Sequence, residues 1–133
     1  MIAEDAVRQA VERFYEAVNQ LQQGDPESML ALWSHAEDIT HMGPRGGQQR
    51  GWAAVRTYWE DAARLAATSP GEVIAAPGDQ VIRVVGDLAY VCGAERVRVT
   101  RDGQMTELAP RATNIFRHEA GQWRLVHRQA ENP

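Results

Sequence analysis

The sequence contains a single cysteine, Cys92, so no disulfide can form within the chain. Cys92 lies in an apolar run, where we expect a buried thiol without a chemical role. The four histidines lack a close ligand spacing such as His-x-x-x-His, and no second cysteine could complete a set, so we expect no metal site. No glycine-rich loop joins a strand to a helix in the pattern that holds phosphates, so we expect no nucleotide and no other cofactor.

Long apolar runs and an excess of positive charge are also missing. No apolar run approaches the length that crosses a membrane, and the acidic N-terminal residues do not resemble a signal peptide. We therefore expect a cytoplasmic protein that has no membrane partner. A net charge of −4 argues against a nucleic-acid partner, since binding to phosphates requires a basic face. No serine has the strand–turn–helix setting of an exposed nucleophile, which argues against a triad hydrolase.

The length and composition are those of one globular domain. The chain has 133 residues, of which 44% are hydrophobic and 24% charged, so it can bury an adequate core without disulfides. We see no linker, internal repeat or low-complexity segment. We therefore expect a single domain over residues 1–133.

The first half of the sequence predicts helices. Apolar residues recur at three- and four-residue steps over residues 4–22 and 52–67, which is the stripe of an amphipathic helix. Asp25 and Pro26 predict the cap and first position of a helix between these two, with Trp33 at the end of its buried face. A short strand is expected over 39–42, and the glycines and proline of residues 43–47 predict a loop.

The second half predicts strands over 72–76, 81–85, 88–100, 105–117 and 123–129. Turns are expected at Pro77-Gly78-Asp79, Gly86-Asp87, Asp102-Gly103 and Ala120-Gly121. Short turns make neighbouring strands antiparallel, so helices followed by a meander indicate an α+β fold with the helices on one sheet face.

Ordered pieces of the sequence resemble the nuclear transport factor 2-like superfamily, and within it the SnoaL-like and ketosteroid isomerase-like branch. These pieces are Phe14-Tyr-Glu-Ala-Val-Asn, Ala31-Leu-Trp, His41-Met-Gly-Pro-Arg-Gly, Arg50-Gly-Trp-Ala-Ala-Val, Thr113-Asn-Ile-Phe-Arg and Gly121-Gln-Trp-Arg-Leu-Val-His. The resemblance covers nearly the whole chain. It implies a cone-shaped fold in which three helices pack on a curved antiparallel sheet that encloses a pocket. It also implies a homodimer formed through the outer sheet face.

The resemblance does not imply one activity, because its members include isomerases, dehydratases, hydrolases, polyketide cyclases and binding modules. Ketosteroid isomerase chemistry needs a carboxylate base, a tyrosine and a neutral acid. By resemblance these positions fall on Gly43, Phe14 and Asn114, so we do not expect a true ketosteroid isomerase.

Three residues are the candidate catalytic groups. The resemblance directs His41 into the cone, where an imidazole could act as a general base. Asn114 alternates with Ala112 and Phe116 on one strand face, so its amide could either polarise a carbonyl or satisfy neighbouring backbone. Glu95 is the third candidate.

The role of Glu95 depends on the sheet register. If Glu95 faces inward, it could form an acid/base couple with His41. If Arg96 faces inward instead, the pocket becomes an anion site. Both residues could also lie at the dimer interface.

Aromatic residues give the pocket region its ligand-binding candidates. We expect Trp33 and Tyr58 as pocket walls, with Phe14, Phe116 and His127 as further ligand-binding residues, whereas Trp52 belongs to packing. His35 and His118 are expected in solvent. The arginines at positions 45, 50 and 56 flank the glycine loop and could attract an acidic ligand.

Two functional hypotheses follow. The first is a cofactor-free isomerase, cyclase or dehydratase that acts on a hydrophobic cyclic or polyketide-like molecule, with His41 as base and Asn114 and Glu95 assisting. The second is a non-catalytic module for small-molecule binding or dimerisation, which the replacements at Phe14 and Gly43 favour.

Overall fold

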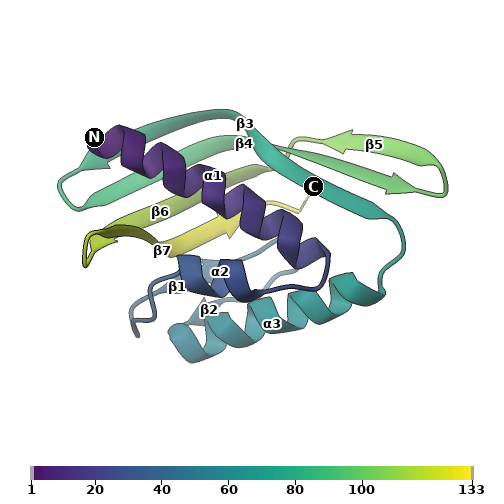
Figure 1. Cartoon of the computed structure of the whole chain (residues 1–133), viewed down its shortest axis with the longest axis horizontal. Helices are drawn as coiled ribbons and strands as arrows, with labels where there is room; N and C mark the ends of the chain where they lie inside the picture. Colours follow the sequence, from purple (N-terminus) through teal and green to yellow (C-terminus); the bar gives the residue numbers. More distant parts are fainter. Residues whose placement is uncertain (1, 133) are drawn as a thin grey trace.

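The computed structural model describes residues 2–132, and its helices pack against one curved sheet (Figure 1). The helices are α1 (Ala3–Gln22), α2 (Glu27–Leu32) and α3 (Trp52–Thr68). The strands are β1 (Thr40–Met42), β2 (Gln49–Arg50), β3 (Glu72–Val85), β4 (Leu88–Arg101), β5 (Gln104–Leu108), β6 (Arg111–Glu119) and β7 (Gln122–Ala130). The α+β class expected from the sequence is confirmed.

The three predicted helices form within two residues of their expected bounds. α1 buries a stripe that includes Val7, Val11 and Phe14, as the three- and four-residue spacing requires. α2 begins at Glu27 rather than at Pro26, while the Asp25 carboxylate still accepts a hydrogen bond of 3.0 Å from the Glu27 amide. The bounds of the helices are therefore determined mainly by residues close to each helix end.

The sheet order is β2-β1-β7-β6-β4-β3, and β5 pairs separately with β4. All pairs are antiparallel except β1 and β7, which run parallel, so the sheet is mixed rather than antiparallel as expected. The paired residues of β1 and β7, such as Thr40 and His127, are 87 positions apart in the sequence, so no hairpin turn constrains the direction of the two strands. α1 crosses one face of the sheet diagonally (Figure 1).

The turn expected at residues 77–79 is wrong. β3 continues through it as a bulge, where Pro77 pairs with Glu95 and Gln80 pairs with Gly93. Gly93 has a φ of +143°, and a Cβ built on it would lie 2.2 Å from the carbonyl oxygen of Asp79. The bulge and the glycine therefore belong together, because only glycine allows this close approach.

The single strand expected over 105–117 is two strands. The chain leaves the sheet after Leu108 and rejoins it at Arg111, because Pro110 has no amide hydrogen to continue a ladder. The two-residue turn at Asp102-Gly103 is confirmed, since φ is +52° and +76° at these residues, as a type I′ turn requires. β4 consequently pairs with β6 along its first half and with β5 along its second.

The core lies between the helices and the inner sheet face. Besides apolar side chains, the core buries five polar residues from the described range 2–132, which are Ser34, His41, Glu95, Asn114 and Arg128. Burial of polar groups has a free-energy cost unless they are paired. Four of the five, His41, Glu95, Asn114 and Arg128, lie close together on the inner sheet face, so this part of the core is unusually polar.

Candidate functional site

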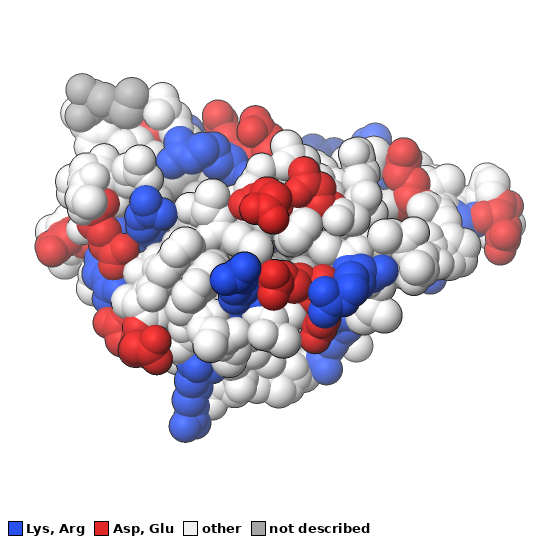
Figure 2. All heavy atoms as spheres, turned by 60° about the horizontal axis from the view of Figure 1, so that its bottom comes forward, with Lys and Arg blue, Asp and Glu red and all other residues white. Residues whose placement is uncertain are grey.

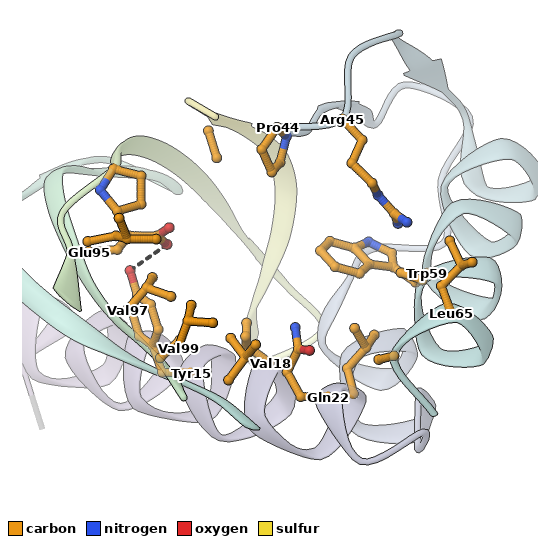
Figure 3. A pocket seen from close by; sticks show the side chains of 18 of the residues that line it. Tyr15, Val18, Gln22, Pro44, Arg45, Trp59, Leu65, Glu95, Val97 and Val99 are labelled. Atoms are coloured by element: carbon orange, nitrogen blue, oxygen red, sulfur yellow. Dashed lines mark hydrogen bonds between the residues drawn. The ribbon is translucent and has the colours of Figure 1, made fainter. Parts of the chain in front are cut away.

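An open cavity of about 450 Å³ lies between α1, α3, the inner sheet face and the loop after β1 (Figure 3). Its apolar wall includes Val18, Leu21, Tyr58, Trp59, Val97 and Val99. Its polar wall includes Tyr15, His41, Arg45, Glu95, Arg101 and Arg128. This volume and mostly apolar lining suit a small organic ligand.

Four polar side chains stand side by side on the inner sheet face. Gln49 of β2 pairs with His41 of β1, His41 pairs with Arg128 of β7, and Arg128 pairs with Asn114 of β6. Directly paired residues of neighbouring strands project to the same face. These four residues, which we term the polar row, therefore cross one end of the sheet as a continuous line.

The His41 ring is fully buried and held in one orientation. Its Nδ1 lies 2.9 Å from Oε1 of Gln49, and an amide oxygen only accepts, so Nδ1 carries the hydrogen and donates it. Trp33, Tyr58 and Trp59 surround the ring, with Tyr58 nearest at 4.4 Å between ring centroids. Among residues 2–132, no group hydrogen-bonds to Nε2. The lone pair of Nε2 is therefore unused.

Burial lowers the pKa of His41 from 6.5 to about 4. The positive charge of Arg128 adds to the effect, and those of His127 and Arg45 contribute further, whereas the hydrogen bond to Gln49 opposes it. The imidazole is consequently neutral at pH 7. It can accept a hydrogen bond or a proton at Nε2, although a low pKa makes it a weak base.

Beside the polar row, Glu95 and Tyr15 complete a hydrogen-bonded network. Arg128 donates to both carboxylate oxygens of Glu95, at 2.9 and 3.1 Å, and to Oδ1 of Asn114 at 3.1 Å. The Tyr15 hydroxyl donates to Glu95 at 2.9 Å and accepts from Gln80 at 2.8 Å. Figure 3 shows the Tyr15–Glu95 bond at one end of the cavity. The network leaves the Glu95 charge fully compensated.

The structure places Glu95 inward and Arg96 outward. Glu95 is buried and lines the cavity, while Arg96 is exposed. Glu95 does not contact His41, however, because Arg128 lies between them in the network. Burial raises the pKa of Tyr15, and the negative charge of Glu95 raises it further, so this hydroxyl stays protonated.

Gly43 shows why a carboxylate base is absent from the position that the resemblance indicated. A Cβ at Gly43 would lie 2.5 Å from the Tyr58 hydroxyl and 2.8 Å from Cε1 of His41. Such distances are too short for any larger side chain without displacing these rings. The place of that base is therefore occupied by Tyr58 and His41.

Several predicted ligand-binding residues lie behind the cavity wall. Phe14, Trp33 and Phe116 are completely buried in the core and do not line the cavity, whereas Tyr58 does. The Arg128 guanidinium lies 4.7 Å above the Phe14 ring, so this ring supports the network from below. Asn114 faces inward as predicted, but it reaches the cavity only through Arg128.

His127 lies on the opposite sheet face from the cavity, where its Nδ1 is 2.7 Å from the Thr40 hydroxyl. The reason is a bulge in β7: Ile115 pairs with His127, but Phe116 pairs with Leu125, which leaves Val126 as an extra residue. The bulge reverses the alternation, so His127 turns outward and Arg128 inward. The expectations of exposure for His35 and His118 are confirmed.

Tyr15, Gln49 and Arg128 belong to the site but were not predicted from the sequence. Tyr15 follows Phe14 on the buried side of α1, so its hydroxyl was a recognisable candidate for a buried partner. Gln49 and Arg128 carried no local signal, because their positions depend on strand pairing. The residues from 2 to 132 contain no group of three or more histidine, cysteine or acidic residues that could hold a metal ion.

No helix within residues 2–132 is long and apolar enough to span a membrane.

The family model of the SnoaL-like domain matches residues 7–130. No curated protein matches the chain in sequence.

Solved structures of similar fold cover nearly the whole chain. An NTF2-like protein of unknown function from Pseudomonas putida KT2440 is 24% identical, with a TM-score of 0.75 over 98% of this chain and 87% of its own. A proposed dehydratase of the NTF2-like family from Streptomyces avermitilis is 23% identical, with a TM-score of 0.76 over 96% and 93%. The CaMKII hub of S. rosetta is 19% identical, with a TM-score of 0.76 over 98% and 97%. These similarities show a shared NTF2-like fold.

Proposed function

Since the chain belongs to the SnoaL-like domain family, we propose that it binds a small hydrophobic cyclic or polyketide-like molecule and transfers a proton on it without a cofactor. The reaction would be an isomerisation, a cyclisation or a dehydration, and each of these begins with removal of a proton next to a carbonyl. The observation that carries the proposal is the unused Nε2 of the buried, neutral His41 in the cavity wall.

His41 is the proposed base, and Gln49 is its positioning residue. The hydrogen bond from Nδ1 to Gln49 fixes the tautomer, so the Nε2 lone pair is free to take a proton from a substrate carbon. The surrounding rings close Nε2 off from solvent. A substrate therefore reaches it only when a ring such as Tyr58 moves, and bound substrate is then shielded from water.

Arg128 is the proposed electrophile, because it is the neighbour of His41 in the polar row and lines the cavity. A carbonyl oxygen directed at the guanidinium would gain negative charge as the proton leaves, and a preorganised cation stabilises that charge. Asn114 and Glu95 hold Arg128 through hydrogen bonds, so their assistance is indirect.

Deuterium exchange tests the proposal without knowledge of the natural substrate. Cyclohexanone and 2-tetralone are incubated with the protein in D2O at neutral pD, and loss of the signals of the protons next to the carbonyl is followed by proton NMR. We expect exchange above the buffer rate for wild type and a loss of about a hundredfold in His41→Gln, which is typical when a general base is removed. His35→Gln, which changes an exposed histidine, is the matched control.

One observation favours the second candidate, a non-catalytic binding module. Among residues 2–132, the carboxylate side chains in the cavity wall are those of Glu95 and Glu131, and both are paired with arginine. Saturation-transfer NMR on the same ketones separates the two candidates. Binding without exchange in wild type would refute catalysis and favour the module. Absence of binding as well as exchange would refute both for this ligand class.

The proposal includes a homodimer formed through the outer sheet face. Val81, Val85, Leu88 and Tyr90 are exposed there on adjacent stretches of β3 and β4. Contiguous exposed apolar side chains indicate an interface. We expect wild type to sediment as a dimer and Val81→Glu to sediment as a monomer. Ile2→Glu, an exposed apolar residue at the start of α1, is the control, and a monomeric wild type would contradict this assignment.

A further inference from the structure

The charges in the cavity wall are unevenly compensated. Arg128 pairs with Glu95, and Glu131 receives bonds of 2.6 to 3.1 Å from Arg111 outside the wall. Within residues 2–132, no carboxylate lies within ion-pair distance of the two other cations that line the cavity, Arg45 and Arg101. The cavity wall therefore has a surplus of positive charge.

Arg45 projects toward the cavity from the loop after β1. Its guanidinium lies 5.2 Å from the centre of the Tyr58 ring, and Figure 3 shows the side chain directed toward the indole of Trp59. The two other arginines near this loop are engaged elsewhere, since Arg50 donates to Gln48 at 2.8 and 3.1 Å and Arg56 pairs with Glu60. Of these three arginines, only Arg45 lines the cavity.

This surplus is local. The chain as a whole carries a net charge of −4. Figure 2 shows acidic and basic side chains interspersed on the face that it presents, with no broad field of one sign. An anionic ligand would therefore be recognised by contacts inside the cavity rather than by long-range attraction.

Building on the proposed function, we propose that the ligand is an apolar molecule that carries one carboxylate group. The apolar part would pack against Trp59, Val97 and Val99, and the carboxylate would bind the guanidinium of Arg45, with Arg101 as a second cation. A planar guanidinium offers two parallel donors that match the two oxygens of a carboxylate. The Tyr58 ring behind Arg45 holds the guanidinium in place through a cation–π contact.

The test compares two probes of nearly equal shape, 4-phenylbutyrate and its neutral amide 4-phenylbutanamide, whose affinities are measured by ligand-observed NMR titration. We expect wild type to bind the carboxylate at least about threefold more tightly than the amide, as one partly screened charge-assisted contact would give. The preference should shrink as salt rises from 50 to 500 mM. Arg45→Gln should lose most of it with the amide affinity unchanged, and the Arg45→Gln/Arg101→Gln variant should lose all of it.

Arg50→Gln is the matched control, because it removes an arginine near the same loop that does not line the cavity. Equal affinities of the two probes for wild type, or a preference that survives in the double variant, would overturn the inference while leaving the cavity as a binding site. Failure of wild type to bind either probe would overturn the inference, whereas the proposed function would still be decided by the exchange and binding of the two ketones.

Discussion

Acidification should destabilise this protein through His41. The imidazole is fully buried, and its pKa falls from 6.5 to about 4, chiefly because burial disfavours the charged form. In the unfolded chain the group regains its ordinary pKa. The unfolded state therefore binds more protons between pH 6.5 and 4, and the native state loses stability as pH falls through that window.

The magnitude follows from the two pKa values. One unit corresponds to about 1.4 kcal/mol, so the free energy of unfolding should drop by roughly 2 kcal/mol between pH 8 and pH 5 and by about 3 kcal/mol at pH 4. Burial also lowers the pKa of His127, which acts in the same direction. The low pKa values of Asp38 and Glu131, which are hydrogen-bonded to arginine, matter only in stronger acid, so measurements should stop at pH 5.

Urea unfolding followed by far-UV circular dichroism at fixed protein concentration measures this effect. Glutamine is similar to histidine in volume but does not titrate. Between pH 8 and pH 5, the free energy of unfolding of His41→Gln should therefore fall by roughly 2 kcal/mol less than that of wild type. His118→Gln, an exposed histidine, should behave as wild type. If wild type and His41→Gln lose equal stability, the imidazole is not buried in its neutral form and the reasoning fails.

Three further changes test the support around the site by urea unfolding at pH 7. Arg128→Met should lower the free energy of unfolding by about 3 to 5 kcal/mol, because it leaves the Glu95 carboxylate buried and unpaired. Adding Glu95→Gln should restore most of that loss. A double variant no more stable than Arg128→Met would contradict this explanation. Tyr15→Phe removes one buried donor to Glu95 and should cost about 1 to 3 kcal/mol. Gly93→Ala should cost about 3 kcal/mol or more, because the new methyl would meet a β3 carbonyl at 2.2 Å, whereas Gly86→Asn, in open space at a φ of +62°, should be tolerated.

Sequence could predict the elements whose signals are local. The stripe of α1 and the turn at Asp102-Gly103 each depend on residues a few positions apart, and both appear as expected. The signal at residues 77–79 failed because pairing with β4 outweighs the turn preference of proline and glycine there. Propensity was overridden by tertiary context, which is the usual limit of local reasoning.

The candidate site was only partly predictable for the same reason. His41 and Glu95 stood out as polar groups on apolar strands, and both are buried on the inner face. Arg128 could not be found, because simple alternation from Leu125 along β7 assigns the inward position to His127. One bulge residue, Val126, shifts the alternation, so that Arg128 faces inward and His127 faces outward. The partner of His41, Gln49, depends on a two-residue strand that the sequence did not indicate.

The polar row contains a conflict that limits which substrates the proposed base can serve. Arg128 would stabilise an enolate, but its charge also disfavours the imidazolium that forms when His41 accepts the proton. A base with a pKa of about 4 transfers protons efficiently only from comparatively acidic carbons. We therefore expect exchange to be faster with 2-tetralone, whose benzylic protons are the more acidic, than with cyclohexanone. Equal rates for the two ketones, after the buffer-catalysed exchange is subtracted, would mean that removal of the proton does not limit the exchange, and this reasoning would fail.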